Sequence, residues 1–362
     1  MKKYFLGMGL FLAGLASCTN NEVVEVSQNQ NAIQFKMPFV ENSTRAATQA
    51  PVTDLTAAGI EHIHVFGWYL PENEQDVEKA VNPFDNASLE VSKGTDNLFN
   101  TNVDWILNQW YSFAAFIDGV DGDAEDWVDD VTFELPTYNT SRLTIPNYEA
   151  TAHDLVIAMP EDVHITTTSN YAVPLMFKHM LSKVRFTFKN NEQSKFKINV
   201  SGIRINNAYK TGTLVADKSS NSVISANWNF TDVVKTGYNY DAIENIKGQE
   251  VGYSENYVIP QSTDGLTVTF TINLHELVDN VDKVIETVDY TASLQIGAIS
   301  NWTFGYAYNY VLSISAEDIN PDLSEKIKFS ASVSSWDYTW DQETGEGSIT
   351  ITPTPVTSTT GQ

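Results

Sequence analysis

The chain has 362 residues, of which 42% are hydrophobic and 19% charged, so it can bury a sizeable core and is not intrinsically disordered. Only 21 basic residues stand against 46 acidic residues, and the net charge of -25 disfavours nucleic acid as a partner because phosphate groups would be repelled. The single cysteine excludes an intramolecular disulfide framework and any CxxC metal cluster.

The N-terminus has the pattern of an export signal. Residues 1–3 are basic at two positions, and residues 4–16 form an apolar stretch that is too short to span a bilayer as a helix. Leu15 to Cys18 fit the bacterial lipobox, in which small residues precede a cysteine that is lipidated and becomes the mature N-terminus. We therefore expect a signal peptide over residues 1–18 and a lipid on Cys18 that holds the precursor at a membrane. The alternative is ordinary secretory cleavage beside an incidental cysteine.

Residues 19–45 are expected to hold a polar tether and a first strand. No aspartate occupies position 19 or 20, which favours the outer membrane of a Gram-negative cell, or its exterior, over retention at the inner membrane. Further along, alternate residues share one apolar face and predict a strand; they are Ile33, Phe35 and Met37. A polar loop follows that contains Arg45, which is the only arginine before Arg142.

Alternation of apolar and polar residues predicts half-buried strands through most of the remaining chain. The clearest examples are Val184, Phe186 and Phe188; Phe196, Ile198 and Val200; Leu266, Val268, Phe270 and Ile272; and Tyr306, Tyr308, Tyr310, Leu312 and Ile314. We expect the rings of Phe186, Phe188, Tyr308 and Tyr310 to point inward. Apolar residues between positions 274 and 288 instead have a helical spacing and predict one short helix.

Many strands and little helix predict an all-β protein made of packed sheets. Consecutive strands lack the helical crossovers that parallel pairing requires, so antiparallel sandwiches are expected. The polar residues 190–192 mark a boundary between an N-terminal β-sandwich domain, residues 46–190, and a C-terminal one, residues 191–362. The end of the second domain, from Thr352 onward, is polar and rich in proline, and we expect it to be mobile.

Few residues suggest chemistry. The acidic run at residues 118–126 has the composition of a calcium loop but fails the EF-hand spacing, so a solvated loop is the simpler interpretation. His62 and His64 would share a strand face, yet no third metal ligand is evident. No catalytic motif appears, so we expect neither a metal, nor a cofactor, nor enzymatic activity. Trp105, Trp110 and Trp127 fill cores by default, although exposed tryptophans also stack on sugars.

Four segments resemble motifs of the fimbrillins, the subunits of type V pili. These are Asp154–Ala158, Pro174–Phe186, Trp302–Tyr310 and Ile327–Trp336. Together with the lipobox they cover nearly the whole chain in the family's order. The resemblance implies two transthyretin-like β-sandwich domains in tandem and a structural or adhesive role without catalysis.

The resemblance also implies a mode of assembly. Similar fimbrillins are secreted as lipoproteins and cut after an arginine by a trypsin-like protease, which here corresponds to cleavage between Arg45 and Ala46. The cut would remove the strand containing Ile33, Phe35 and Met37 and leave a groove with unpaired backbone groups.

A strand from a neighbouring subunit would then fill the groove by β-augmentation. The chain has a candidate donor in residues 348–352, where Ile349 and Ile351 share one face. A head-to-tail contact of this kind does not close and produces a filament. The alternative is that the first strand stays in its own sheet and that Arg45 is an ordinary loop residue.

Three functions remain open at this point. The first is a fimbrillin subunit, whose partners are other subunits, the outer membrane through the precursor's lipid, the processing protease, and a host or bacterial surface ligand. The second is an uncut anchor or a surface glycan-binding lipoprotein that keeps Cys18 and presents Trp105 or Trp127 to sugars. The third is a surface glycosidase, because the 46 acidic residues always offer pairs of carboxylates. Stalk, tip and anchor subunits are not distinguished by the sequence.

Overall fold

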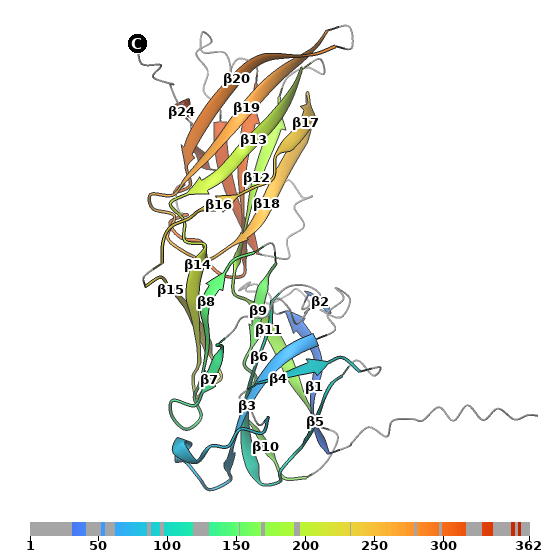
Figure 1. Ribbon diagram of the computed structural model, residues 1–362, viewed down its shortest axis with the longest axis vertical. Helices are drawn as coiled ribbons and strands as arrows, with labels where there is room; N and C mark the ends of the chain where they lie inside the picture. The colour runs from blue at the N-terminus through green and yellow to red at the C-terminus, as the bar shows by residue number, and fades with distance from the viewer. Residues whose placement is uncertain are drawn as a thin grey trace, which may run out of the picture.

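The computed structural model describes residues 31–40, 52–54, 62–84, 88–94, 98–118, 130–151, 153–167, 171–191, 196–231, 233–278, 281–296, 299–315, 328–335, 349–351 and 354–355. Strands dominate these segments, and the molecule is elongated (Figure 1). Their helical structure is a single 3-10 turn at Val77–Lys79. None of the described segments contains a helix long and apolar enough to cross a membrane.

The strands of the N-terminal half are β1 (Ala32–Val40), β2 (Val52–Asp54), β3 (His62–Pro71), β4 (Ser88–Ser92), β5 (Phe99–Asp104), β6 (Gln109–Asp118), β7 (Thr132–Glu134), β8 (Ser141–Glu149), β9 (Leu155–Ala158), β10 (Val163–Ile165) and β11 (Ala172–His179). Those of the C-terminal half are β12 (Ser182–Asn190), β13 (Phe196–Asn206), β14 (Thr211–Lys218), β15 (Ile224–Asn229), β16 (Tyr238–Asn239), β17 (Ile243–Lys247), β18 (Val251–Val258), β19 (Thr267–Val278), β20 (Val281–Ser293), β21 (Tyr306–Ile314), β22 (Lys328–Ser335), β23 (Ile349–Ile351) and β24 (Thr354–Pro355).

Nine of the described strands form one sheet, in the order β2-β1-β11-β9-β6-β3-β4, with β10 paired to β6 and β5 paired to β1. This sheet curls back on itself because β4 and β5 also meet. Lys93 and Phe99 form a β-bridge, and the amide of Gly94 donates to the carbonyl of Leu98 at 2.7 Å. We call it the rolled sheet; its inner face encloses a core of aromatic and aliphatic side chains.

A four-stranded sheet, β15-β14-β8-β7, packs against the outer face of the rolled sheet (Figure 1). Phe66 and Phe116 of the rolled sheet share a hydrophobic cluster with Phe133 and Leu143 of the smaller sheet. The indole of Trp68 donates to the carbonyl of Phe133 at 2.6 Å, which adds a polar bond between the two layers. The rolled sheet therefore buries side chains on both faces.

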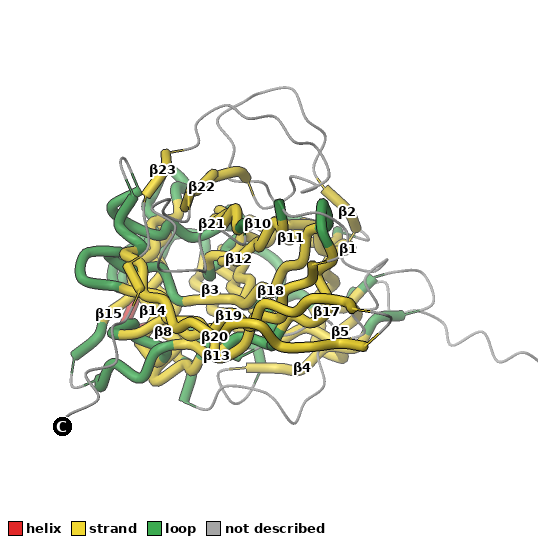
Figure 2. Tube along the Cα trace, turned by 90° about the horizontal axis from the view of Figure 1, so that it is seen from above, coloured by secondary structure: helices red, strands yellow, loops and turns green. Residues whose placement is uncertain are grey.

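The other half of the molecule consists of two sheets packed face to face. One is β18-β12-β21-β22-β23, and the other is β16-β13-β19-β20-β24 with β17 paired to β13. They lie in separate layers when the molecule is viewed along its length (Figure 2). The four rings expected to point inward, Phe186, Phe188, Tyr308 and Tyr310, are all buried. Alternation therefore predicted the inner face of this sandwich correctly.

The prediction of a short helix over residues 274–288 is wrong. This segment contains the end of β19 and most of β20, which pair antiparallel along their length. Residues 281–287 of β20 are exposed on both faces. Val281 and Ile285, two residues of the helical pattern, lie on this exposed stretch, where no buried face constrains the spacing of apolar residues.

The expectation of purely antiparallel sheets is also wrong, because two of the four sheets are mixed. β1 runs parallel to β11, and β12 runs parallel to β21. A helical crossover is needed only when parallel partners follow each other closely in sequence. Here each pair is separated by many intervening strands, so the chain reverses through other parts of the fold.

β11 and β12 are joined directly by Met180 and Leu181, which are both fully buried. β11 belongs to the rolled sheet, whereas β12 is an inner strand of the five-stranded sheet of the sandwich, paired to β18 on one side and β21 on the other. The division expected near residue 190 falls between β12 and β13, which belong to the two facing sheets of the sandwich, and it stays a prediction. The smaller sheet contains strands from both sides of residue 190, since β8 pairs with β14.

Candidate assembly site at the first strand

β1 lies inside the rolled sheet, although it is the first described strand of the chain. Phe35 pairs with Val173 of parallel β11 on one side and with Phe99 of antiparallel β5 on the other. The amide of Trp105 donates to the carbonyl of Asn31 at 2.9 Å, which extends the pairing beyond the strand. β1 therefore joins β11 to β5, two strands whose association the sequence pattern did not predict.

The inner face of β1 contributes to the core of the rolled sheet. Ile33 and Phe35 are 0% exposed, and the Phe35 ring packs edge-on against Phe113 with centroids 5.3 Å apart. Burial of two such side chains contributes about 1.5–3 kcal/mol each. Met37 belongs to β1, but its side chain lies outside the described residues, and the pairing with β11 shifts register between Lys36 and Phe39.

Loss of β1 would leave unpaired backbone groups on β11 and β5 at the same time. It would also uncover Phe99, Phe113 and Val173, all of which are fully buried with β1 in place. Exposed edges next to an apolar floor favour pairing with another extended segment. The site therefore has the chemistry of a strand-binding groove that is filled by the chain's own first strand.

The candidate donor residues lie in the sandwich, at the edge of the five-stranded sheet that is opposite β18. Ile349 and Ile351 are the ends of β23, which pairs antiparallel with β22 at the edge of the five-stranded sheet. Thr354 and Pro355 then form β24, which pairs with β20 of the facing sheet. The C-terminal segment is thus placed on its own sandwich in this structure, and it would have to leave β22 before donating a strand.

Several residues named from the sequence lie outside the described residues. These are the lipidation residue Cys18, the processing residues Arg45 and Ala46, and Trp127. The acidic run is described only at Asp118, whose carboxylate accepts a hydrogen bond of 3.0 Å from the Tyr148 hydroxyl. Calcium binding by this run is likewise outside the described part of the chain.

The structure describes the other residues considered for sugar stacking or metal binding. Trp105 is 6% exposed and packs edge-on against Tyr111, so it is a core residue and presents no face to sugars. His62 lies 3.1 Å from a Glu90 oxygen, and His64 packs against the Phe116 ring at 5.4 Å. Within the described segments no group of three or more His, Cys, Asp or Glu side chains is arranged to hold a metal ion.

His64 predicts a pH effect on stability. Burial among aromatic rings lowers its pKa from 6.5 to about 4 because the charged form loses solvation. The unfolded chain then binds more protons than the folded chain between pH 6.5 and pH 4, so stability should fall as the pH decreases through this window. The melting temperature of His64→Phe should fall less over the same window than that of the wild type. His153→Gln, at an exposed histidine, is the control and should keep the wild-type slope.

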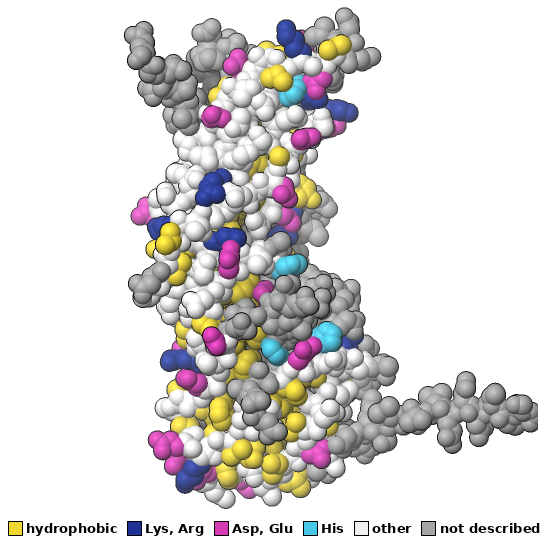
Figure 3. Space-filling model, viewed as in Figure 1, with side chains coloured by type: hydrophobic (Ala, Val, Ile, Leu, Met, Phe, Trp, Pro, Cys, Tyr) yellow, Lys and Arg dark blue, Asp and Glu magenta, His cyan; other side chains and the backbone are white. Residues whose placement is uncertain are grey.

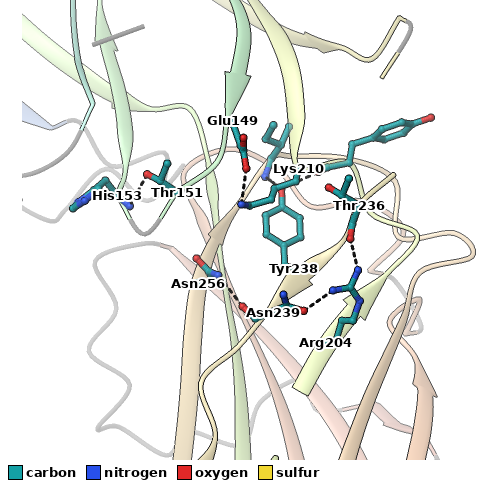
Figure 4. A network of polar contacts seen from close by, with 11 residues as sticks. Glu149, Thr151, His153, Arg204, Lys210, Thr236, Tyr238, Asn239 and Asn256 are labelled. Carbon is teal, nitrogen blue, oxygen red and sulfur yellow. Dashed lines mark hydrogen bonds and ion pairs between the residues drawn. The ribbon is translucent and has the colours of Figure 1, made fainter. Parts of the chain in front are cut away.

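A network of polar contacts lies where the smaller sheet meets the sandwich (Figure 4). Glu149, at the end of β8, accepts a 2.7 Å bond from Lys210, and Arg204 of β13 donates to Asn239 and to the carbonyl of Thr236. Buried Tyr238 donates to the carbonyl of Tyr209 and accepts from the amide of Ile259. Burial raises the pKa of Tyr238, so the phenol stays neutral and keeps both bonds.

Charged and hydrophobic side chains are distributed differently over the described surface. On the face shown in Figure 3, charged side chains are scattered, whereas hydrophobic side chains gather over the end of the molecule that holds the rolled sheet. No charged cluster of an enzyme site accompanies the buried first strand. Fold and site together define a β-protein in which the first described strand completes a sheet made by distant parts of the chain.

The chain belongs to the Fimbrillin-like family, whose model matches residues 44–336. This is a family of cell-surface fimbrial and adhesion proteins and not of enzymes. The fold resembles that of a fimbrial protein from Bacteroides vulgatus, with 14% identity, a TM-score of 0.50, and coverage of 84% of this chain and 99% of that one. A candidate cell-adhesion protein from Bacteroides uniformis aligns with 15% identity, a TM-score of 0.43, and coverage of 84% and 99%. No curated protein matches the chain.

Proposed function

We propose that this protein is a pilus subunit that assembles after its first strand has been cut away. The observation that supports this most directly is the position of β1, which is N-terminal yet fully enclosed between β11 and β5. One cut after Arg45 would release the whole strand because β1 ends at Val40 and β2 begins at Val52. No other described strand combines a terminal position with pairing on both sides.

The precursor travels, in this proposal, as a lipoprotein. A lipid on Cys18 holds it at the outer membrane until a trypsin-like protease cleaves between Arg45 and Ala46. The lipid and the first strand then leave together, since both precede the cut. The mature subunit remains at the cell surface through its contacts with neighbouring subunits in the fimbrium.

Head-to-tail growth follows when the C-terminal strand of one subunit enters the groove of the next. Ile349 and Ile351 would replace Ile33 and Phe35 against Phe113. The two sandwich-like halves, proposed as tandem transthyretin-like domains, place the groove and the donor at different parts of an elongated molecule (Figure 1). This separation favours an open filament over a closed ring.

An uncut anchor subunit is a second candidate function. It is favoured by the way β1 completes the rolled sheet without help from another chain. Such a subunit would keep Cys18 and its lipid, and would receive no donor strand.

The N-terminus of the protein purified from the cell surface separates these functions. A mature start at Ala46 is expected for a polymerising subunit, and Arg45→Ala should convert it into a form that starts at Cys18. Replacement of Lys36, the exposed basic residue within β1, by alanine is the control and should leave processing unchanged. A wild-type surface form that still starts at Cys18 would contradict strand removal and support the anchor.

A further inference from the structure

A groove lies between the rolled sheet and the turn that joins β14 to β15. It consists of two adjoining hollows of about 700 and 390 Å³, which share Trp110, Glu161, Asp162 and Ser222 in their lining. The larger hollow extends over the outer side of β11 at Met176, and the smaller one over Asn221 and its neighbours in the turn. Because the two hollows share these lining residues, we treat them as one groove.

The aromatic residue at the centre of the groove is held in a fixed orientation. Trp110 of β6 pairs in register with His164 of β10, and their rings stack with centroids 4.7 Å apart and planes 15° apart. The neighbouring residue Tyr111 points into the core, so Trp110 is on the outer face of the sheet, where it is half-buried. A tryptophan that lines both hollows offers a rigid apolar surface of the size of a pyranose ring.

A carboxylate beside Trp110 is held by a buried network. Asp162 Oδ1 accepts from the ammonium of Lys218 at 2.6 Å and from the hydroxyl of Ser112 at 2.5 Å. Lys218 is 2% exposed and also donates to the carbonyl of Pro160 at 2.8 Å. The other oxygen, Asp162 Oδ2, makes none of the hydrogen bonds found among the described residues, and it is therefore an oriented acceptor for a hydroxyl group.

The lining favours one class of ligand. Lys218 already neutralises Asp162, while Glu161 and the net charge of -25 would repel an anionic molecule. A purely apolar ligand would leave these carboxylates and the hydroxyl and amide groups of Ser222 and Asn221 without partners. Neutral sugars present both C–H faces for Trp110 and hydroxyl groups for Asp162.

We propose that this groove binds a neutral oligosaccharide, with Trp110 stacked on one sugar ring and Asp162 accepting from its hydroxyls. The inward residues of β11 line the β1 groove, whereas the outward Met176, 43% exposed, lines the sugar groove. The two sites are on opposite faces of the same strand. The proposed sugar contacts of Trp110 and Asp162 lie outside β1 and β11, so they do not require the proposed strand exchange, and either can fail without the other.

The test uses the full-length protein without its signal peptide on an array of neutral and sialylated glycans, followed by calorimetry with the best neutral hexasaccharide. Wild type should bind neutral glycans, and Trp110→Ala should weaken binding at least tenfold. Asp162→Asn should weaken it less, because the amide oxygen can stay with Lys218 and Ser112 while the amide nitrogen, in place of the free oxygen, donates to a sugar hydroxyl. Tyr253→Ala, at a 56% exposed aromatic on β18 outside the groove, is the matched control and should bind like wild type.

Met176→Arg gives a second variant whose fold is not at risk, since the replaced side chain is exposed and the longer one fills the larger hollow. It should also weaken binding at least tenfold at an unchanged melting temperature. The proposal is overturned if no neutral glycan binds, if only sialylated glycans bind, or if Trp110→Ala and Met176→Arg both bind like wild type. Polymerisation after trimming should be unaffected by Trp110→Ala and by Asp162→Asn.

Discussion

Replacing Phe35 by alanine is expected to lower the free energy of unfolding of the full-length protein by about 3–5 kcal/mol. The Phe35 ring is fully buried against Phe113 in the core of the rolled sheet, so its removal leaves a cavity that backbone pairing on both sides of β1 prevents from closing. Urea unfolding followed by circular dichroism measures the difference. Lys36→Ala, at the exposed neighbour, should change it by no more than about 0.5 kcal/mol.

Trimming provides an internal control for the same variant. If cleavage after Arg45 removes β1, the trimmed wild type and the trimmed Phe35→Ala protein are the same chain and should unfold identically. A difference that survives trimming would mean that the first strand remains bound. A Phe35→Ala protein as stable as wild type before trimming would contradict the burial of this strand.

Charged residues in the candidate donor should abolish polymer formation. Ile349→Asp together with Ile351→Asp removes about 3–6 kcal/mol of apolar burial from an inserted strand, which corresponds to a loss of roughly 10²–10⁴-fold in affinity. Two carboxylates facing Phe113 without partners would add to this cost. Trimmed wild type should form a ladder on a gel run without boiling, and the trimmed double variant should remain a monomer.

Full-length protein of either sequence should also remain a monomer because β1 occupies its groove. Thr350→Asp places one charge between the two isoleucines, on the other face of the strand, and should still polymerise. If the double variant polymerises as well as wild type, the donor lies elsewhere, and β23 is only an edge strand next to β22.

The sequence predicted those parts of the fold in which one buried face imposes a period of two. Phe186 and Tyr310 show this, since both lie on β-strands and both are buried. The pattern failed at Val281 and Ile285, where β20 extends beyond the core and neither face is buried. Local alternation also contains no information on which distant strand lies alongside, so the parallel pairing of β1 with β11 was not foreseen.

Of the two candidate sites, one could be predicted from the sequence and the other could not. Ile33 and Phe35 could be placed on one face of a strand from their spacing alone. The groove around Trp110 could not, because Asp162 precedes β10 of the rolled sheet while Lys218 ends β14 of the smaller sheet, and their pairing depends on how these two sheets pack. Trp105 and Trp110 look alike in sequence, yet one is buried in the core and the other lines a groove.

The short connection between β11 and β12 determines how the subunit would carry mechanical load. Tension applied to a strand in the groove passes to β11, crosses Met180 and Leu181, and enters β12 along its length. β12 is held by eight residue pairs with β18 and eight with β21, so a pull along this strand loads both ladders in shear and their hydrogen bonds must break together. The force at which a filament of such subunits extends would therefore depend on how fast the sandwich unfolds under load, and not on the strength of any one contact.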